Sequence, residues 1–153
     1  GPVPVSARKF SSEDSLKIAA IYQTTVQMMS QPRIRLKIDS LIHHAHTGIR
    51  LAEASGFPTF VPDFYTNIAY GYKGIGKFDS AIRYSSLAYQ QAVKMNYIRG
   101  MARSGYTRAM VFFDHGDIKE SIEQLSKNLE LGRKHQLTAQ LYANYLLLAN
   151  ITG

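Results

Sequence analysis

The chain has 153 residues, of which 45% are hydrophobic and 19% are charged, and it contains no cysteine and no tryptophan. This length is sufficient for one globular domain with its own core. The lack of cysteine excludes a disulfide framework, thiolate zinc and iron–sulfur sites, and a cysteine nucleophile, because each of these requires the sulfur atom. No apolar run approaches the roughly 20 residues that cross a bilayer, so we expect no membrane segment.

The formal net charge of +7 is concentrated in the middle of the chain. Between Phe64 and Phe113 there are seven basic residues and one acidic residue. The simpler interpretation is a set of solvated helix faces, and the alternative is a surface for an anionic partner.

Residues 1–11 are expected to be a flexible lead that contains a tag remnant, because Gly1-Pro2 resembles the pair that protease cleavage leaves behind. This interpretation is compatible with a leader or membrane segment that has been removed. The location in the cell is therefore open, with the cytoplasm favoured and a periplasmic sensor domain as the alternative.

In chain order, the helical period of apolar residues and the placing of glycines and prolines predict seven helices and no strand. The predicted helices are 12–30, 34–55, 62–74, 79–96, 98–114, 118–135 and 138–151. Pro32, Pro58 and Pro62 fall at boundaries, as the missing N–H of proline requires. Asp79 is expected to cap the fourth helix with its carboxylate.

A six-residue pattern recurs at a spacing of 40 residues. It reads K-I-D-S-L-I at residues 37–42, K-F-D-S-A-I at 77–82 and D-I-K-E-S-I at 117–122, with glycine before the second and third copies. Such self-similarity predicts a stacked array of helix pairs. The expected domain covers residues 12–151, with units at about 20–60, 61–100 and 101–140 and the start of a fourth at 141–151.

The second unit combines small and aromatic residues at fixed places: Tyr65, Ile68, Ala69 and Tyr72 on its first helix, Gly76 and Phe78 at the turn, and Ala81 and Ala88 on its second helix. This arrangement resembles the tetratricopeptide repeat, in which small side chains let helices approach and aromatic side chains fill the remaining space. We therefore expect Ala69, Ala81, Ala88 and Ala109 to be buried at helix contacts.

The other two units depart from the motif. The third keeps Ala109, Phe112, Gly116, Ile118 and Ser121 but has Gly105, Arg108 and Asn128 in place of the aromatic, leucine and second alanine. The first has Met28-Met29 and Pro32 in place of Leu-Gly and tyrosine. A period of 40 exceeds the family's usual value of about 34. Such elongated units resemble those of bacterial sensor and transcription-regulator arrays.

The resemblance implies an all-α fold, a right-handed superhelical array of antiparallel helix pairs whose first helices line a concave surface. It implies binding of a protein or peptide there, without catalysis or a cofactor, in a bacterial signalling protein such as a histidine kinase or transcription regulator. The residues projected onto that surface are Asp63, Thr66, Asn67, Tyr70, Lys73, Arg103, Tyr106, Thr107, Met110 and Phe113. The family's dicarboxylate clamp is not favoured, because only Asn67 and Arg103 match it.

Two other functions remain as alternatives. Arginine and tyrosine interleave at Arg99, Arg103, Tyr106 and Arg108, which is compatible with binding of a single-stranded nucleic acid. A purely structural spacer or dimerisation module is the third interpretation.

Two patterns imitate known sites and are interpreted as structural. Residues 71–78, G-Y-K-G-I-G-K-F, match a phosphate-binding loop except at the last position, where Phe78 lacks the hydroxyl that ligates magnesium. His43, His44 and His46 offer too few ligands on one helix face for a metal site. No catalytic constellation accompanies them.

The last helix is expected to leave apolar surface for a continuation of the array or a second copy of the chain to cover. Its apolar residues are Tyr142, Tyr145, Leu146, Leu147, Leu148 and Ile151. If only helix 118–135 shields it, Tyr145, Leu148 and Ala149 are covered, while Leu146, Leu147 and Ile151 meet water.

Overall fold

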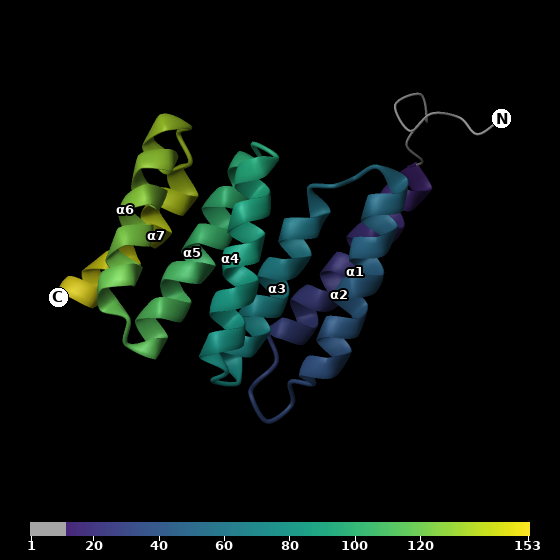
Figure 1. Ribbon diagram of the computed structural model, residues 1–153, viewed down its shortest axis with the longest axis horizontal. Helices are drawn as coiled ribbons and strands as arrows, with labels where there is room; N and C mark the ends of the chain where they lie inside the picture. Colours follow the sequence, from purple (N-terminus) through teal and green to yellow (C-terminus); the bar gives the residue numbers. More distant parts are fainter. Residues whose placement is uncertain (1–11) are drawn as a thin grey trace.

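The computed structural model describes residues 12–153 and is all-α, as predicted, with no strand in that range (Figure 1). The prediction for residues 1–11 lies outside the described residues. The seven helices are α1 (Ser12–Met29), α2 (Ile38–Ser55), α3 (Phe60–Gly74), α4 (Phe78–Lys94), α5 (Ile98–His115), α6 (Ile118–Lys134) and α7 (Thr138–Thr152).

The helix boundaries differ most from the prediction at the start of α2. This helix begins at Ile38 rather than residue 34, because the preceding residues form a separate turn. The N–H groups of Arg35 and Leu36 donate to the carbonyl oxygen of Pro32 at 2.8 and 3.0 Å, and Lys37 is extended.

The predicted cap at Asp79 is also wrong: α4 begins one residue earlier, and the side chain of Asp79 lies in its first turn.

The helices form a curved array with an inner and an outer layer. Every helix packs against its neighbours in the chain, and in addition α1 contacts α3, α3 contacts α5, and α5 contacts α7. No such contact joins α2, α4 and α6 among the described helices. The odd-numbered helices are therefore the more closely spaced set and form the inner layer.

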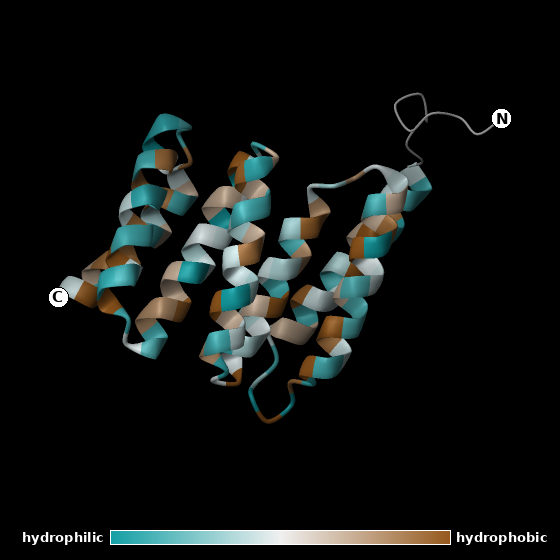
Figure 2. Cartoon of the chain, viewed as in Figure 1, coloured by the Kyte–Doolittle hydropathy of each residue, from teal (hydrophilic) through white to brown (hydrophobic). Residues whose placement is uncertain are grey.

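The interior combines small and large residues at the helix contacts. Ala69, Ala81, Ala88 and Ala109 are completely buried, which confirms the prediction from the repeat. Figure 2 shows that hydrophobic and hydrophilic residues are interspersed along the helices, so that each helix can offer apolar positions to its neighbours. No helix among the described residues is long and apolar enough to cross a membrane.

Glycine is required at the two turns within the repeats. Gly76 and Gly116 have φ angles of 76° and 90°, which place them in the left-handed region that other residues rarely adopt. In each turn the N–H of the next residue donates back to the end of the helix, from Lys77 to Tyr72 at 3.0 Å and from Asp117 to Phe112 at 2.8 Å. This hydrogen bond closes the turn in both units.

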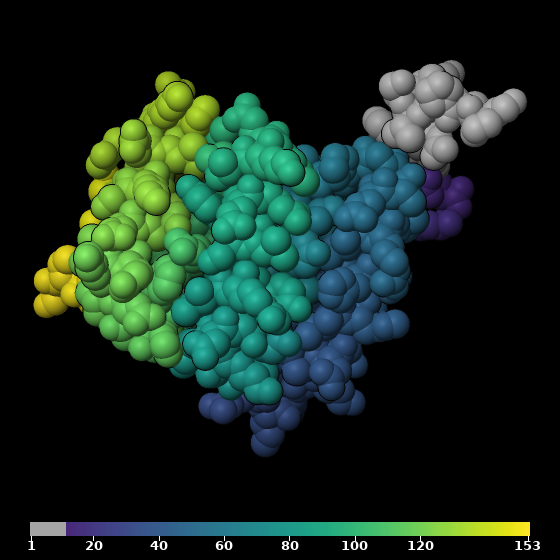
Figure 3. All heavy atoms as spheres, in the orientation of Figure 1, coloured from purple at the N-terminus to yellow at the C-terminus, as the bar shows by residue number. Residues whose placement is uncertain are grey.

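The exposed face of α7 differs from the predicted one. Leu147 is only 7% exposed, and it packs with Ala109 and Leu125, with Leu148 and Ile151 beside them. The prediction that Leu147 meets water is wrong, and Ile151 is partly buried rather than open to water, because α7 packs against α5 as well as α6. Leu146 is 51% exposed, as predicted, whereas Tyr145 and Ala149 are exposed rather than covered. In Figure 3 the last turn of α7 projects from the edge of the array.

Candidate ligand-binding groove

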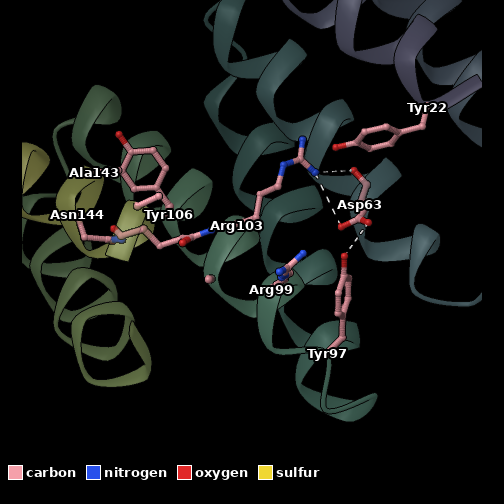
Figure 4. A pocket seen from close by; sticks show the side chains of 11 residues that line it. Tyr22, Asp63, Tyr97, Arg99, Arg103, Tyr106, Ala143 and Asn144 are labelled. Atoms are coloured by element: carbon pink, nitrogen blue, oxygen red, sulfur yellow. Dashed lines mark hydrogen bonds and ion pairs between the residues drawn. The ribbon is translucent and has the colours of Figure 1, made fainter. Parts of the chain in front are cut away.

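An open cavity of about 420 Å³ lies in the inner layer (Figure 4). Each odd-numbered helix contributes to its wall, and one residue comes from the turn before α5. The lining residues are Tyr22 from α1, Asp63 from α3, Tyr97 from the turn, Arg99, Ala102, Arg103 and Tyr106 from α5, and Ala139, Gln140, Ala143 and Asn144 from α7.

One end of the cavity is a hydrogen-bonded cluster around Asp63. The hydroxyl of Tyr97 donates to Asp63 Oδ2 at 3.0 Å. Arg103 Nη1 donates to the backbone oxygen of Asp63 at 3.3 Å and lies 4.0 Å from its Oδ1 atom. The guanidinium group of Arg103 also lies 5.6 Å from the centroid of the Tyr22 ring, which allows a cation–π interaction. Figure 4 shows these four side chains converging.

A buried amide behind this cluster fixes the position of Arg103. Arg103 Nη2 donates to Asn67 Oδ1, and Asn67 Nδ2 donates to the hydroxyl of Thr25 at 2.9 Å. Thr25 in turn donates to the carbonyl oxygen of Tyr22 at 2.7 Å. The hydrogen-bonded chain therefore runs from α5 through α3 to α1 and ties these three inner helices together, without α7.

Burial determines the protonation of the cluster. It raises the pKa of the Asp63 carboxyl, while the hydrogen bond from Tyr97 and the charge of Arg103 act in the opposite direction. Burial, followed by the charge of Asp63, raises the pKa of the Tyr97 hydroxyl. Burial is also the main cause of the raised pKa of Tyr22, and Arg103 opposes it. Both tyrosines therefore keep their protons at neutral pH and present neutral rings and hydroxyls.

The other end of the cavity is apolar and rests on a chain of buried amides. Asn144 is hydrogen-bonded to Asn128, and Asn128 to Gln124, each at 2.9 Å. Gln124 Oε1 accepts from Arg108 Nη1 at 2.8 Å. Because the amide of Asn144 is engaged in this way, the surface here is made mainly by the alanines of α5 and α7 and by the Tyr106 ring, with the amide of Gln140 beside them.

The cavity contains three of the ten residues projected from the sequence: Asp63, Arg103 and Tyr106. Asn67 lies behind Arg103, while Thr66 and Thr107 are buried, so none of these three faces the opening. The hydroxyl of Thr66 donates to the carbonyl oxygen of Pro62 at 2.8 Å.

The other four projected residues lie outside the cavity. Lys73 contacts the ring of Tyr70 at 5.3 Å and forms an ion pair with Asp114 at 3.0 Å. Met110 and Phe113 pack against the cluster of Ala109, Leu125 and Leu147.

Sequence reasoning missed the whole α7 wall, although the repeat contained the signal. A shift of 40 residues relates Asp63 to Arg103 and Arg103 to Ala143, and it also relates Arg99 to Ala139. Extending the register to the last helix would have found these positions. The same shift relates Ala102 to Pro62 and Pro62 to Tyr22.

Within the part of the chain that the structure describes, the residues of the loop-like pattern at 71–78 and the histidines of α2 have structural roles. Gly71 is buried within α3, next to Leu41, and the ring of Phe78 lies 5.3 Å from that of His115. His43 and His44 are exposed, and His46 packs on the ring of Tyr65. No group of three or more His, Cys, Asp or Glu residues in the described range is placed to hold a metal ion.

Comparison of the chain with family models, with curated proteins and with solved structures finds no match. The argument for function therefore depends on the geometry and chemistry of the groove.

Proposed function

We propose that this chain is a tetratricopeptide-like module that binds a peptide or protein segment in the groove of its inner layer. The observation that carries the proposal is the cavity itself, because its wall is assembled from α1, α3, α5 and α7. A ligand placed there contacts four helices that are far apart in the sequence.

The lining has the composition of a peptide-binding surface. Tyr22, Tyr97 and Tyr106 supply rigid rings with a polar end, which are favourable contacts at low entropic cost. Ala102, Ala139 and Ala143 leave room for an apolar side chain between the rings. Gln140 offers an amide for the backbone of an extended ligand.

The groove is also preorganised. The hydrogen bonds from Arg103 to Asp63 and Asn67 hold the α3 and α5 walls in place before a ligand arrives. Binding to a rigid surface loses less conformational entropy than binding to a mobile one.

The proposed setting rests on the resemblance of the 40-residue units alone. We place the module in the sensory or scaffolding part of a bacterial signalling protein, such as a histidine kinase or transcription regulator. The nucleic-acid alternative is less favoured, because Arg103 and Arg108, two of the cations it requires, are hydrogen-bonded inside the fold.

The test is selection of ligands from a library of random dodecapeptides, followed by obstruction of the groove. Ala139→Phe places a ring on an exposed position of the cavity wall, and Ala149→Phe makes the same change on an exposed position of α7 outside it. We expect Ala139→Phe to weaken binding of the selected peptides at least about tenfold, since it removes the space for an apolar side chain. Ala149→Phe should have no effect.

Equal affinities of wild type and Ala139→Phe, with unchanged circular dichroism and melting temperature, would refute the groove as the binding site. The nucleic-acid alternative would be favoured if the chain bound oligonucleotides with an affinity that fell steeply with added salt and bound no peptide.

A further inference from the structure

Three charged side chains line the cavity: Asp63, Arg99 and Arg103. Asp63 and Arg103 offset one another through the contacts described above. Arg99, the second residue of α5, is exposed, and it makes no hydrogen bond, ion pair or ring contact with any residue in the range 12–153. The groove therefore has one cation without a partner from the described fold.

Arg103 is not free to receive a ligand in the same way. Its two terminal nitrogens donate to the Asp63 backbone and to Asn67, and its guanidinium group lies over the Tyr22 ring. Separating it from these groups would leave the buried amide oxygen of Asn67 without the donor it accepts from, which is unfavourable. Arg103 is thus a positioning residue of the wall, and the free charge belongs to Arg99.

Arg99 lies near the Tyr97 end of the groove, on the face of α5 that continues to its apolar part. On α5 it shares a face with Ala102, Arg103 and Tyr106, which follow it by three, four and seven residues. Figure 4 shows Arg99 near Tyr97, with Tyr106, Ala143 and Asn144 toward the other end. A cation at the edge of an apolar cavity attracts an anion more strongly than one on an open surface, because the low-dielectric wall focuses its field.

We propose that the groove selects peptides that carry a carboxylate and that Arg99 is the residue that recognises it. This inference rests on the proposed function. A guanidinium group matches a carboxylate because it can donate two parallel hydrogen bonds to the two oxygens. The carboxylate is that of an Asp or Glu side chain, and the test below separates it from a free C-terminus.

The spacing along α5 adds a second property of the ligand. At a rise of about 1.5 Å per residue, Ala102 and Tyr106 lie about 5 and 10 Å beyond Arg99 along the helix axis. An extended peptide advances about 3.3 Å per residue. The acidic group and a bulky apolar side chain should therefore be about two or three positions apart.

The experiment uses two random dodecapeptide libraries, one tethered through the C-terminus and one through the N-terminus. Only the second offers a free C-terminal carboxylate. Each is selected on the wild-type chain, on Arg99→Gln, and on Lys119→Gln as the control. Lys119 is exposed on α6, outside the cavity, so its substitution removes the same charge elsewhere.

We expect peptides from the wild type to be enriched in Asp and Glu near an apolar residue, and this enrichment to disappear for Arg99→Gln alone. The affinity of a selected synthetic peptide should fall about fivefold with Arg99→Gln and less with Arg99→Lys, which retains the charge. Binding confined to the N-tethered library without enrichment in Asp or Glu would show recognition of a free C-terminus instead, and it would overturn the inference.

Equal losses for Arg99→Gln and Lys119→Gln would overturn the inference, because they would show a general effect of net charge. Selection of groove-binding peptides without acidic residues would overturn it as well. If the substitution Ala139→Phe still weakened the binding of those peptides, the proposed function would stand while the role of Arg99 would not.

Discussion

Around α1, α2 and α3 the interior of the array is mostly apolar, with the hydrogen-bonded pair Asn67 and Thr25 as its polar part, whereas between α5, α6 and α7 it is crossed by a chain of buried amides. The first region contains Ile18, Ala45, Ile49, Ala52, Val61, Phe64 and Ile68. The second has the smaller cluster Ala109, Leu125 and Leu147, next to Gln124, Asn128 and Asn144. Equivalent positions of the repeat carry apolar residues in the first region and polar residues in the second. A shift of 40 residues relates buried Phe64 to buried Ser104 and then to buried Asn144.

This difference shows that one repeat geometry accommodates two kinds of core. In the apolar region stability comes from burial and close packing, which are not directional. In the polar region each amide is stabilised only while its partner is present, and removing one partner leaves the others buried and unpaired. The two regions should therefore respond differently to substitution.

The largest effect is expected for Phe64→Ala in the apolar region. Phe64 is completely buried, and its ring lies directly against Gly48. Truncation should lower the free energy of unfolding by about 3–5 kcal/mol, through lost burial and a cavity. Urea denaturation measures this loss, and the control is the substitution Leu16→Ala at an exposed position. A change similar to that of the control would show that this region does not hold the array together.

A smaller loss is expected for Asn128→Ala in the polar region. It deprives Gln124 and Asn144 of one partner each, at about 1–3 kcal/mol in total, because Gln124 keeps its hydrogen bond from Arg108 and Asn144 its hydrogen bond to the carbonyl oxygen of Gln140. A double-mutant cycle of Asn128→Ala with Asn144→Ala sharpens the comparison, because residues in one network should be coupled by at least about 0.5 kcal/mol. Strict additivity of the two unfolding free energies would contradict the network.

The smallest effect is expected on the pH dependence of the free energy of unfolding, through Asp63, which lies between the two regions. Because burial raises the pKa of this carboxyl above its ordinary value of 3.8, the folded chain binds its proton more tightly than the unfolded chain does. Stability from this group is fully present below that value and is lost as the pH rises through the higher folded pKa. Asp63→Asn should therefore show a weaker fall in stability above pH 3.8 than wild type. Identical pH profiles of urea denaturation would refute this.

The sequence was sufficient to predict the helices and the contacts that repeat, because both depend on periodicity. Ala69 and Ala109 were found in this way. It was not sufficient to predict the groove, because Thr66 and Thr107 share the inner layer with Asp63 and Arg103 but turn into the interior. Leu147 is buried because α7 also contacts α5, and a plan in which each helix packs only on its neighbour in the chain does not include that contact.

The central claim is that the inner layer binds the ligand, and backbone amide chemical shifts test it most directly. A peptide selected on the wild-type chain is titrated into the isotope-labelled protein, and the shifts are followed residue by residue. We predict that the largest changes fall on Arg99–Tyr106 of α5 and Ala139–Asn144 of α7. Changes confined to α2, α4 and α6 would contradict the account.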